Sequence, residues 1–258
     1  MQEWIGDFHI HTLLSPCAEI EMTPHHIVLR AAEAGVQMLA ITDHNTSANV
    51  EAALVAAEEY GVKVFPGMEV ECKEEAHLVL LFDRLEQVQA MQSVVDAAMS
   101  GRKNVPERFG SQFVVDADDE FVAEEERLLL APLTLSAAAI ISSCSALGGL
   151  SIAAHIDRPA YSLVGQLGFL PPDLDLVAAE ISPPGLVELQ LQRLRRLVGT
   201  LPYITNSDAH RMADFLAGPK NLVRLAAAPT VAELKLALAG AEGRSWQAGY
   251  HLTFNTEQ

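Results

Sequence analysis

The stretch DFHIHT at residues 7–12 closes an apolar run and carries two histidines that are two residues apart. In a β-strand this spacing puts both side chains on the same face. We therefore expect His9 and His11 to project together from a strand end. Five other apolar runs have histidine or carboxylate beside them: ITDHN with Asp43 and His44, GMEVE with Glu69 and Glu71, EEAHLVLLF with His77, IAAHIDR with His155, and NSDAH with Asp208 and His210.

Apolar runs of strand length alternate with segments of helical periodicity along most of the chain. Strands are predicted at 4–10, 37–43, 62–68, 77–82, 149–155, 176–181 and 202–207, and helices at 24–34, 47–60, 84–99, 135–147, 160–168, 186–199 and 230–240. Repeated strand–helix units predict an α/β fold with a mainly parallel sheet. A barrel brings every strand end to one mouth, so we predict a closed barrel of about seven β/α units.

The chain has 258 residues, and the candidate ligands run from His9 to His210, so two domains would divide the site. We predict a single domain over 1–258. Residues 100–127 break the strand–helix rhythm because they are highly charged and contain Pro106 and Gly110. They are interpreted as an insertion between the fourth and fifth strands, with a hairpin around 116–120, which serves as a lid or an interface.

The net charge is −17, from 17 basic and 34 acidic residues. A chain this acidic has no general attraction to a long phosphate backbone, so long nucleic acids are not expected as partners. A small phosphorylated substrate remains compatible, because its recognition is local. The sequence does not indicate an oligomeric state.

Three cysteines without CxxC spacing are typical of a reducing compartment. The acidic N-terminus does not resemble a signal peptide, and a cytoplasmic location is expected. Residues 128–154 contain no charge and are long enough to span a bilayer. They also contain Pro132 and the pair Gly148-Gly149, which favour a helix at 135–147, a turn and a buried strand. No membrane partner is therefore expected.

The histidine and carboxylate segments indicate a polynuclear metal centre, because burying so many polar groups is costly unless a cation coordinates them. Nitrogen and oxygen donors without obligatory thiolates suit Zn, Mn or Fe. His25, His26 and His251 are assigned ordinary structural roles. Glu71, Glu74 and Glu75 are assigned to a solvated turn.

HIH at 9–11, TDHN at 42–45, PGMEV at 66–70, the isolated His77, AHIDR at 154–158 and NSDAH at 206–210 resemble, in this order, the motifs of the PHP (polymerase and histidinol phosphatase) superfamily. The resemblance covers about residues 5–211. It implies a distorted, TIM-like seven-stranded β/α barrel with two or three divalent metal ions. It also implies phosphoesterase chemistry.

Carried over by position, the resemblance implies three sets of metal ligands. These are His9, His11, Glu69 and Asp208 for the first ion; Glu69, His77 and His155 for the second; and His44, His210 and a first-loop residue for the third. The loop SPCAEIEMTP at 15–24 departs from the family pattern. Counting back from Pro24 selects Glu19, with Glu21 and Cys17 as alternatives. If none of them binds, two ions remain.

The resemblance implies attack of a metal-bound hydroxide on phosphorus. Asp208 or a carboxylate of the first loop is predicted to take the proton, and either Arg158 or Arg211 to clamp the phosphate oxygens. Asp7 and Asp43 each lie next to a candidate ligand, and Glu180 lies at the end of the sixth predicted strand. Asp7 and Asp43 are expected to orient histidines, and Glu180 to contact substrate or an arginine.

The predicted function is hydrolysis of a small phosphomonoester or nucleotide phosphate. The alternatives are phosphodiester cleavage of short oligonucleotides, an amidohydrolase-type reaction, and a non-catalytic metal-binding module. The amidohydrolase alternative needs a lysine that can be carboxylated, for which only Lys63 and Lys73 lie near the right strands.

Overall fold

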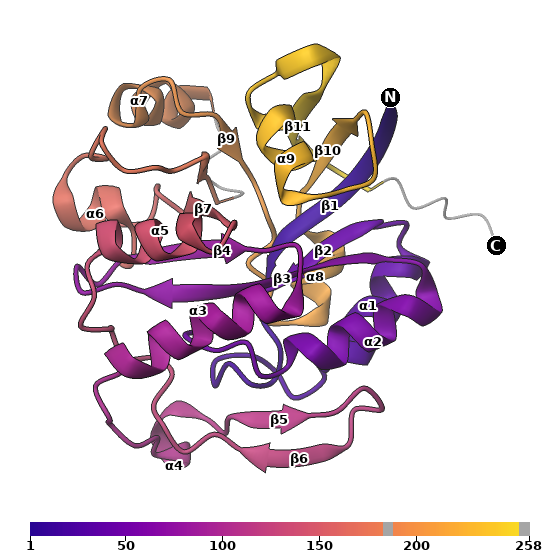
Figure 1. Cartoon of the computed structure of the whole chain (residues 1–258), viewed down its shortest axis with the longest axis vertical. Coiled ribbons are helices and arrows are strands. Elements are labelled where there is room, and N and C mark those ends of the chain that lie inside the picture. Colours follow the sequence, from indigo (N-terminus) through magenta and orange to yellow (C-terminus); the bar gives the residue numbers. More distant parts are fainter. Residues whose placement is uncertain (183–187, 253–258) are drawn as a thin grey trace.

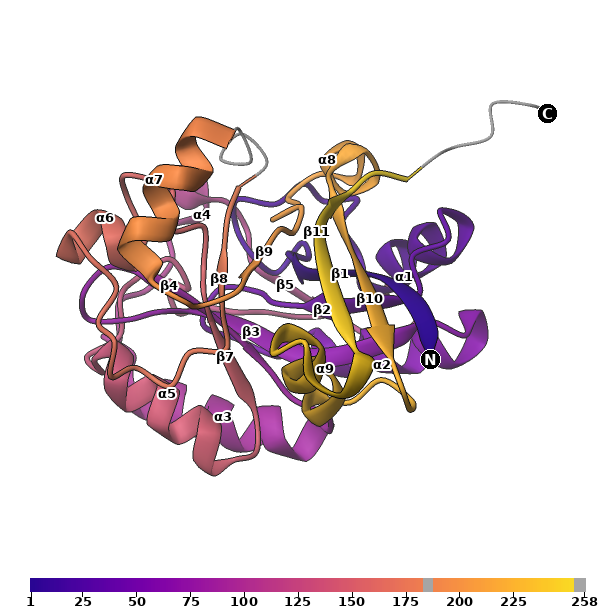
Figure 2. The same cartoon turned by 90° about the horizontal axis from the view of Figure 1, so that it is seen from above.

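The computed structural model describes residues 1–182 and 188–252, and its main sheet has nine strands within that part of the chain. The strand order is β11-β10-β1-β2-β3-β4-β7-β8-β9. The outermost strands, β9 and β11, lie side by side, so the sheet nearly closes into a barrel (Figure 2). The strands are β1 (Gln2–Ile10), β2 (Met38–Ile41), β3 (Lys63–Glu71), β4 (His77–Leu81), β7 (Leu150–Ala153), β8 (Ala178–Glu180), β9 (Tyr203–Ile204), β10 (Lys220–Leu225) and β11 (Ser245–Tyr250).

The helices lie around this sheet (Figure 1). They are α1 (Pro24–Glu33), α2 (Val50–Tyr60), α3 (Leu85–Ala98), α4 (Pro106–Phe109), α5 (Ala137–Ala146), α6 (Leu163–Leu167), α7 (Glu188–Val198), α8 (Met212–Ala217), α9 (Val231–Leu238) and a 3-10 turn at Ala241–Gly243. The TIM-like α/β fold is thus confirmed. Residues 186–187, the start of one predicted helix, lie outside the described residues.

Alternating side chains along each strand build two separate apolar clusters. On β2, Met38 and Ala40 belong to a cluster inside the barrel, whereas Leu39 and Ile41 belong to the cluster between the sheet and the helices. This is the alternation expected of a closed sheet. Helix α9 contributes to the inner cluster through residues such as Leu234 and so packs against the inner face of the sheet.

The prediction of a mainly parallel sheet is wrong for β4, which runs antiparallel to both β3 and β7. Only residues 72–76 join β3 to β4. A parallel connection needs about a dozen residues, whereas a short turn suffices for an antiparallel pair. As a consequence, the start of β4 lies at the same barrel end as the end of β3, and His77 pairs with Glu71.

The strand count of seven is also too small. The seven predicted strands correspond to β1, β2, β3, β4, β7, β8 and β9, and the structure adds the antiparallel pair β10 and β11 beside β1. Strand β10 begins with the buried polar residues Lys220 and Asn221, which break the apolar pattern that predicts a strand. Its neighbour β11, SWQAGY, is similarly mixed.

The segment at 100–127 forms α4 and a two-stranded sheet of β5 (Phe113–Val115) and β6 (Phe121–Glu124), which lies beside the barrel (Figure 1). Asn49 at the start of α2 binds it twice, through Phe113 O at 3.2 Å and Val115 N at 3.0 Å. Asp119 in its hairpin accepts hydrogen bonds from Thr23 Oγ1 and His25 N at the start of α1. The single-domain organisation stays a prediction.

The uncharged stretch at 128–154 forms α5 and β7, as predicted. Among the described residues, no helix combines the length and the apolarity needed to cross a bilayer. The cytoplasmic location stays a prediction.

Candidate metal centre

Glu69 on β3 lies at the centre of a histidine cluster at the mouth of the barrel. Its side chain is 1% exposed, and imidazole nitrogens surround both carboxylate oxygens. The distances to the nearest oxygen are 2.9 Å from His77 Nδ1, 2.9 Å from His44 Nδ1, 3.1 Å from His155 Nε2, 3.2 Å from His9 Nε2 and 3.4 Å from His11 Nε2.

Asp208, which follows β9, is the second carboxylate of the cluster. Its Oδ1 lies 3.3 Å from Nε2 of both His9 and His11, and 3.7 Å from His210 Nδ1. Its Oδ2 lies 2.6 Å from Arg158 Nη2. Asp208 therefore connects the histidines to an arginine that is 43% exposed at the mouth.

A bulge in β1 aims the first two histidines. Between the pairs Asp7–Leu39 and Ile10–Ile41, β1 contains one residue more than β2. Bulges beside functional sites re-aim side chains. Phe8 consequently packs inside the barrel, while His9 and His11 both face Glu69 and Asp208.

His155 and Asp208 adopt strained backbone conformations, with φ of +25° and +47° respectively. A non-glycine residue in this region costs about 1–3 kcal/mol and persists only where its surroundings hold it. The His155 amide donates to Glu180 Oε2 at 3.1 Å, which helps to hold this conformation.

The donor set fits divalent cations. Three groups each bring ligand atoms within 4.8 Å of one another: His11, His44 and His210; His9, His11 and Asp208; and His44, Glu69 and His77. Nε2 of His9 and Nε2 of His11 face each other at 3.2 Å. Glu69 Oε2 and Asp208 Oδ1 are buried without a hydrogen bond. Coordinated cations would satisfy these atoms, whose burial is otherwise costly.

The electrostatics of the cluster separate His9 from His11. Burial opposes charge on His9, but Glu180, Asp208 and Glu69 outweigh it and raise the pKa of His9 well above its ordinary value. Burial and the neighbouring His210 and His44 hold the pKa of His11 well below its ordinary value. His11 is therefore neutral, whereas His9 would release a proton to coordinate a cation.

The two central carboxylates stay ionised. Burial disfavours the charge on Glu69, but His77, His9 and His44 outweigh it and hold its pKa well below the usual range. The pKa of Asp208 is lowered in the same way, because the neighbouring His9 and His11 outweigh burial.

Glu180, at the end of β8, orients His9. Its two oxygens lie 3.1 and 2.9 Å from His9 Nδ1, and Oε1 accepts from Asn206 Nδ2 at 2.9 Å. Occupying Nδ1 in this way leaves Nε2 free to face the cluster. The prediction placed Glu180 at the mouth but assigned it to substrate or an arginine, and not to a histidine.

Asp43 acts on His11 through Ser15. It accepts from Thr12 N and Ser15 Oγ, both at 2.7 Å, and Ser15 Oγ lies 2.9 Å from His11 Nδ1. Asp7, in contrast, contacts no histidine among the residues that the structure describes. It lies 2.9 Å from Lys220 Nζ and accepts from Ser207 N.

Two predicted site residues lie outside the cluster. Glu19 Oε1 and Arg211 Nε pair at 3.0 Å with side chains that are 48% and 64% exposed. Neither residue lines the cavity at the histidines. The structure therefore does not bring Glu19 to the predicted third metal, nor Arg211 to the predicted phosphate position. Cys17 of the same loop does line the cavity.

A cavity of about 250 Å³ opens onto the cluster, and three of its lining residues were not predicted for the site: Glu71, Leu130 and Tyr161. Glu71 is 6% exposed and not part of a solvated turn. The signal for it was its position two residues after Glu69, on the same strand face. The Tyr161 ring lies 5.1 Å from the His77 ring and is 52% exposed.

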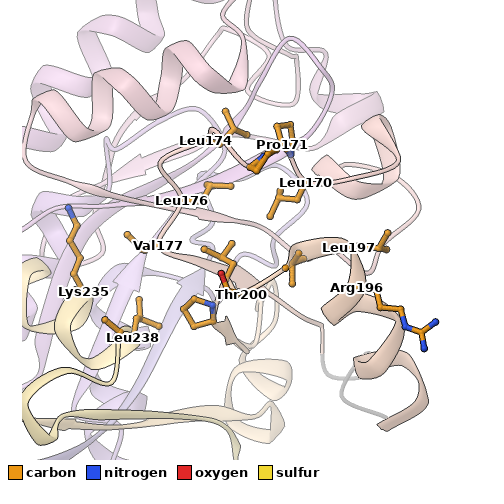
Figure 3. Close-up of a pocket in the computed structure, with 16 residues that line it drawn as sticks. Leu170, Pro171, Leu174, Leu176, Val177, Arg196, Leu197, Thr200, Lys235 and Leu238 are labelled. Atoms are coloured by element: carbon orange, nitrogen blue, oxygen red, sulfur yellow. The ribbon is translucent and has the colours of Figure 1, made fainter.

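A second cavity of about 610 Å³ shares Arg158 as a wall and includes Arg193 of α7. A third, of about 770 Å³, is lined mainly by apolar residues and contains none of the clustered histidines or carboxylates (Figure 3). Neither Lys63 nor Lys73 lines the histidine cavity. Lys63 lies over the Phe65 ring near the start of β3, and Lys73 follows its end.

The barrel and its histidine–carboxylate cluster define the class of metal-dependent phosphoesterase barrels. A model of the PHP domain family matches residues 7–164, which is more than half of the chain, and the chain belongs to this family. The predicted resemblance is thereby confirmed.

The chain is similar to two curated relatives over short segments. It is 35% identical to the 5'-3' exoribonuclease of Haemophilus influenzae over 82 residues, which are 30% of this chain and 29% of that protein. It is 38% identical to the phosphoribosyl 1,2-cyclic phosphate 1,2-diphosphodiesterase of Eggerthella lenta over 66 residues, or 26% of this chain and 24% of that protein. The matches thus span less than a third of either relative.

Solved structures of other proteins share this fold. Endonuclease Q of Pyrococcus furiosus superposes with a TM-score of 0.67 at 21% identity, covering 95% of this chain and 58% of the endonuclease chain. A complex of endonuclease Q with a 27-mer duplex substrate that has an abasic lesion at the active site superposes with a TM-score of 0.69, at the same identity and coverage.

The expectation of a small phosphorylated partner and no long nucleic acid is therefore wrong. An exoribonuclease is among the relatives, and the same fold is found in an endonuclease bound to duplex DNA. Net charge sums over the whole surface, whereas bound cations and nearby arginines set the potential at a site. The charge of −17 consequently does not exclude nucleic acids.

Proposed function

We propose that this chain is a metal-dependent phosphodiesterase that hydrolyses short nucleic-acid strands. One observation carries the proposal. The cluster around Glu69 opens into a cavity whose wall, Arg158, is shared with a second cavity of about 610 Å³. A phosphomonoester needs room on one side of its phosphorus, whereas a phosphodiester needs room on both.

The cofactors would be two or three divalent ions, and Zn, Mn or Fe suits these donors. The residues that would hold them are His9, His11, His44, Glu69, His77, His155, Asp208 and His210. When bound, such ions neutralise charge on the non-bridging phosphate oxygens and activate water for attack on phosphorus.

Side chains of the protein itself orient the metal-binding histidines and position Arg158. Glu180 fixes the tautomer of His9, and Ser15 does the same for His11. Asp208 Oδ2 positions Arg158 at 2.6 Å, while Asp208 Oδ1 stays available to a cation or a proton. The Arg158 guanidinium can donate two parallel hydrogen bonds to a phosphate in the cavity.

Two exposed side chains are placed to contact a nucleic-acid strand, which extends beyond a single phosphate group. Tyr161 presents an aromatic ring at the mouth, where a base can stack for about 1–3 kcal/mol. Arg193 lines the second cavity, where it would meet the next phosphate of the strand.

The test uses short single-stranded RNA and DNA, labelled at either end, with Mn²⁺ or Zn²⁺. We expect metal-dependent shortening of the strands that stops on chelation and falls by at least about 100-fold in Asp208→Asn. Hydrolysis of p-nitrophenyl phosphate or a cyclic phosphate without strand cleavage would overturn the proposal. Unchanged strand cleavage by Asp208→Asn would overturn it as well.

Arginines of α7 offer a matched pair of variants. Arg193→Ala should raise the KM for strands, because Arg193 lines the cavity beside Arg158. Arg195→Ala is the control, since Arg195 lies over the Tyr203 ring at 5.6 Å and does not line that cavity.

A further inference from the structure

We propose that Cys17 supplies the first-loop donor to a cation held by His44 and His210. This inference rests on the metal-dependent function proposed above. It assigns a thiolate to a corner of the centre where counting along the sequence selects the carboxylate of Glu19.

The loop that carries Cys17 is anchored on both sides of it. Before it, Ser15 O accepts from Ala18 N at 2.9 Å, and Ser15 Oγ accepts from the His44 amide at 3.2 Å. After it, the Glu19 amide donates to His210 O at 2.9 Å. Cys17 is therefore held between a contact to His44 and a contact to His210.

The segment at 100–127 packs against the same loop. A Cβ atom on Gly110 would lie 2.2 Å from Pro16 O, and the φ of Gly110 is +101°. Only glycine allows this approach. The loop is thus confined from the outside directly beside Cys17.

Cys17 shares a cavity with buried carboxylate oxygens that have no hydrogen bond. It lines the same cavity as His44 and His210, together with Glu69 and Asp208. The side chains of these two acids are 1% and 8% exposed, and Glu69 Oε2 and Asp208 Oδ1 have no hydrogen bond. Buried, unsatisfied oxygens beside a thiol and imidazoles are the surroundings of a cation site.

The imidazoles at this corner are close together. The His11 ring lies 4.2 Å from the His210 ring and 4.4 Å from the His44 ring, and one nitrogen of each lies within 4.8 Å of the others. Cys17 lines the same cavity as His44 and His210 of this group.

The two acids of the loop are engaged elsewhere. Glu19 pairs with Arg211 at the surface, and Glu21 is exposed. Neither lines the cavity. Among the three first-loop candidates, only Cys17 lines the cavity that the histidines line.

Coordination by Cys17 has a chemical consequence. The thiol gives its proton to solvent as the sulfur–metal bond forms. A sulfur donor favours Zn²⁺ or Fe²⁺ over Mn²⁺, which prefers oxygen ligands. This corner should therefore select a softer cation than the Glu69 and Asp208 corner.

Thiol labelling of the full chain tests the inference without an activity assay. Cys72 and Cys144 are buried, and burial raises their pKa values to about 12 and about 11, so both thiols react slowly. Fast alkylation by iodoacetamide then reports Cys17, the exposed thiol. We expect Zn²⁺ loading to slow this reaction at least about tenfold relative to chelator-treated protein.

Elemental analysis and Co²⁺ spectra supply the second readout. Cys17→Ser should lose the fast alkylation, one metal per chain and the sulfur-to-cobalt charge-transfer band of the Co²⁺ form. Glu19→Gln is the matched control on the same loop, and it should retain all three.

Three outcomes would overturn the inference. Cys17 could be alkylated equally fast with and without Zn²⁺, or Glu19→Gln could lose the metal that Cys17→Ser retains. Both leave the proposed function standing if the protein still cleaves strands with metal. A wild-type chain that binds no divalent ion would overturn the inference and the proposed function together.

Discussion

The cluster around Glu69 and the buried network around Lys220 both place charged groups in the interior, but only the second pairs its carboxylate with a buried lysine. Lys220 and Asp7 are fully buried with Nζ and Oδ2 2.9 Å apart, and Lys220 Nζ also donates to Gly218 O at 3.1 Å. In the network around Lys220, Asn221 donates to Asn206 at 2.9 Å.

The two regions meet at Asn206, which donates to Glu180. On the Glu69 side of this contact, no lysine is among the described residues that line the cavity, and the two acids face imidazole nitrogens and the Arg158 guanidinium. Burial of polar groups alone therefore does not identify a site. The distinguishing feature is an excess of imidazole and carboxylate donor atoms, among which Arg158 pairs with Asp208 Oδ2.

The largest effect is expected from Glu69→Gln. It removes the charge on which five histidines converge, so we expect strand cleavage to fall by more than about 1000-fold. Circular dichroism should show a folded protein, because the Lys220 network is untouched. A variant that is inactive and unfolded would mean that Glu69 acts mainly on stability.

The converse change is Lys220→Met, which should act on stability. Removing one partner of a buried pair leaves the other charge unpaired and costs about 3–5 kcal/mol. Urea unfolding of metal-free protein measures this loss. Lys63→Met is the control, because it removes only a cation–π contact worth no more than about 1 kcal/mol. Equal losses of unfolding free energy in the two variants would show that the buried Lys220–Asp7 pair stabilises the fold no more than the Lys63 contact does.

Glu180→Gln probes the contact between the two regions. A carboxylate that orients a metal-binding histidine contributes about 10–100-fold to affinity or activity. We expect metal affinity to fall within this range in a competition assay with a chelating dye. Glu74→Gln, in the turn after β3, should leave the affinity unchanged.

The smallest expected effect belongs to Tyr161 at the rim. Tyr161→Ala should raise the KM for strands about tenfold, since base stacking contributes about 1–3 kcal/mol. Tyr161→Phe keeps the ring and should restore the KM. If both variants raise it equally, the hydroxyl and not the ring contacts the substrate.

Much of the centre could be predicted from strand-end histidines, because the ends of parallel strands share one edge of the sheet. His9, His11, His44, His155 and Asp208 were found together for this reason. His77 lies with them for a different reason. Strand β4 runs antiparallel to β3, as the short connection at 72–76 requires, so the start of β4 lies at the mouth.

The loop ligand and the last two strands could not be predicted. Counting residues selects Glu19, but the hydrogen bond from the Glu19 amide to His210 O sets the loop register and leaves Cys17 at the cavity. The φ values of His155 and Asp208 also depend on contacts from distant segments. Strand β10 stayed hidden because Lys220 and Asn221 satisfy their polar groups only after folding.

The divalent metal content of the purified chain, measured by elemental analysis, tests most directly whether the histidine–carboxylate cluster binds metal ions. We predict two or three ions per chain in the wild type and a loss of ions in Glu69→Gln. A metal content at background in wild-type protein after incubation with Zn²⁺, Mn²⁺ or Fe²⁺ would show that the cluster does not bind divalent ions.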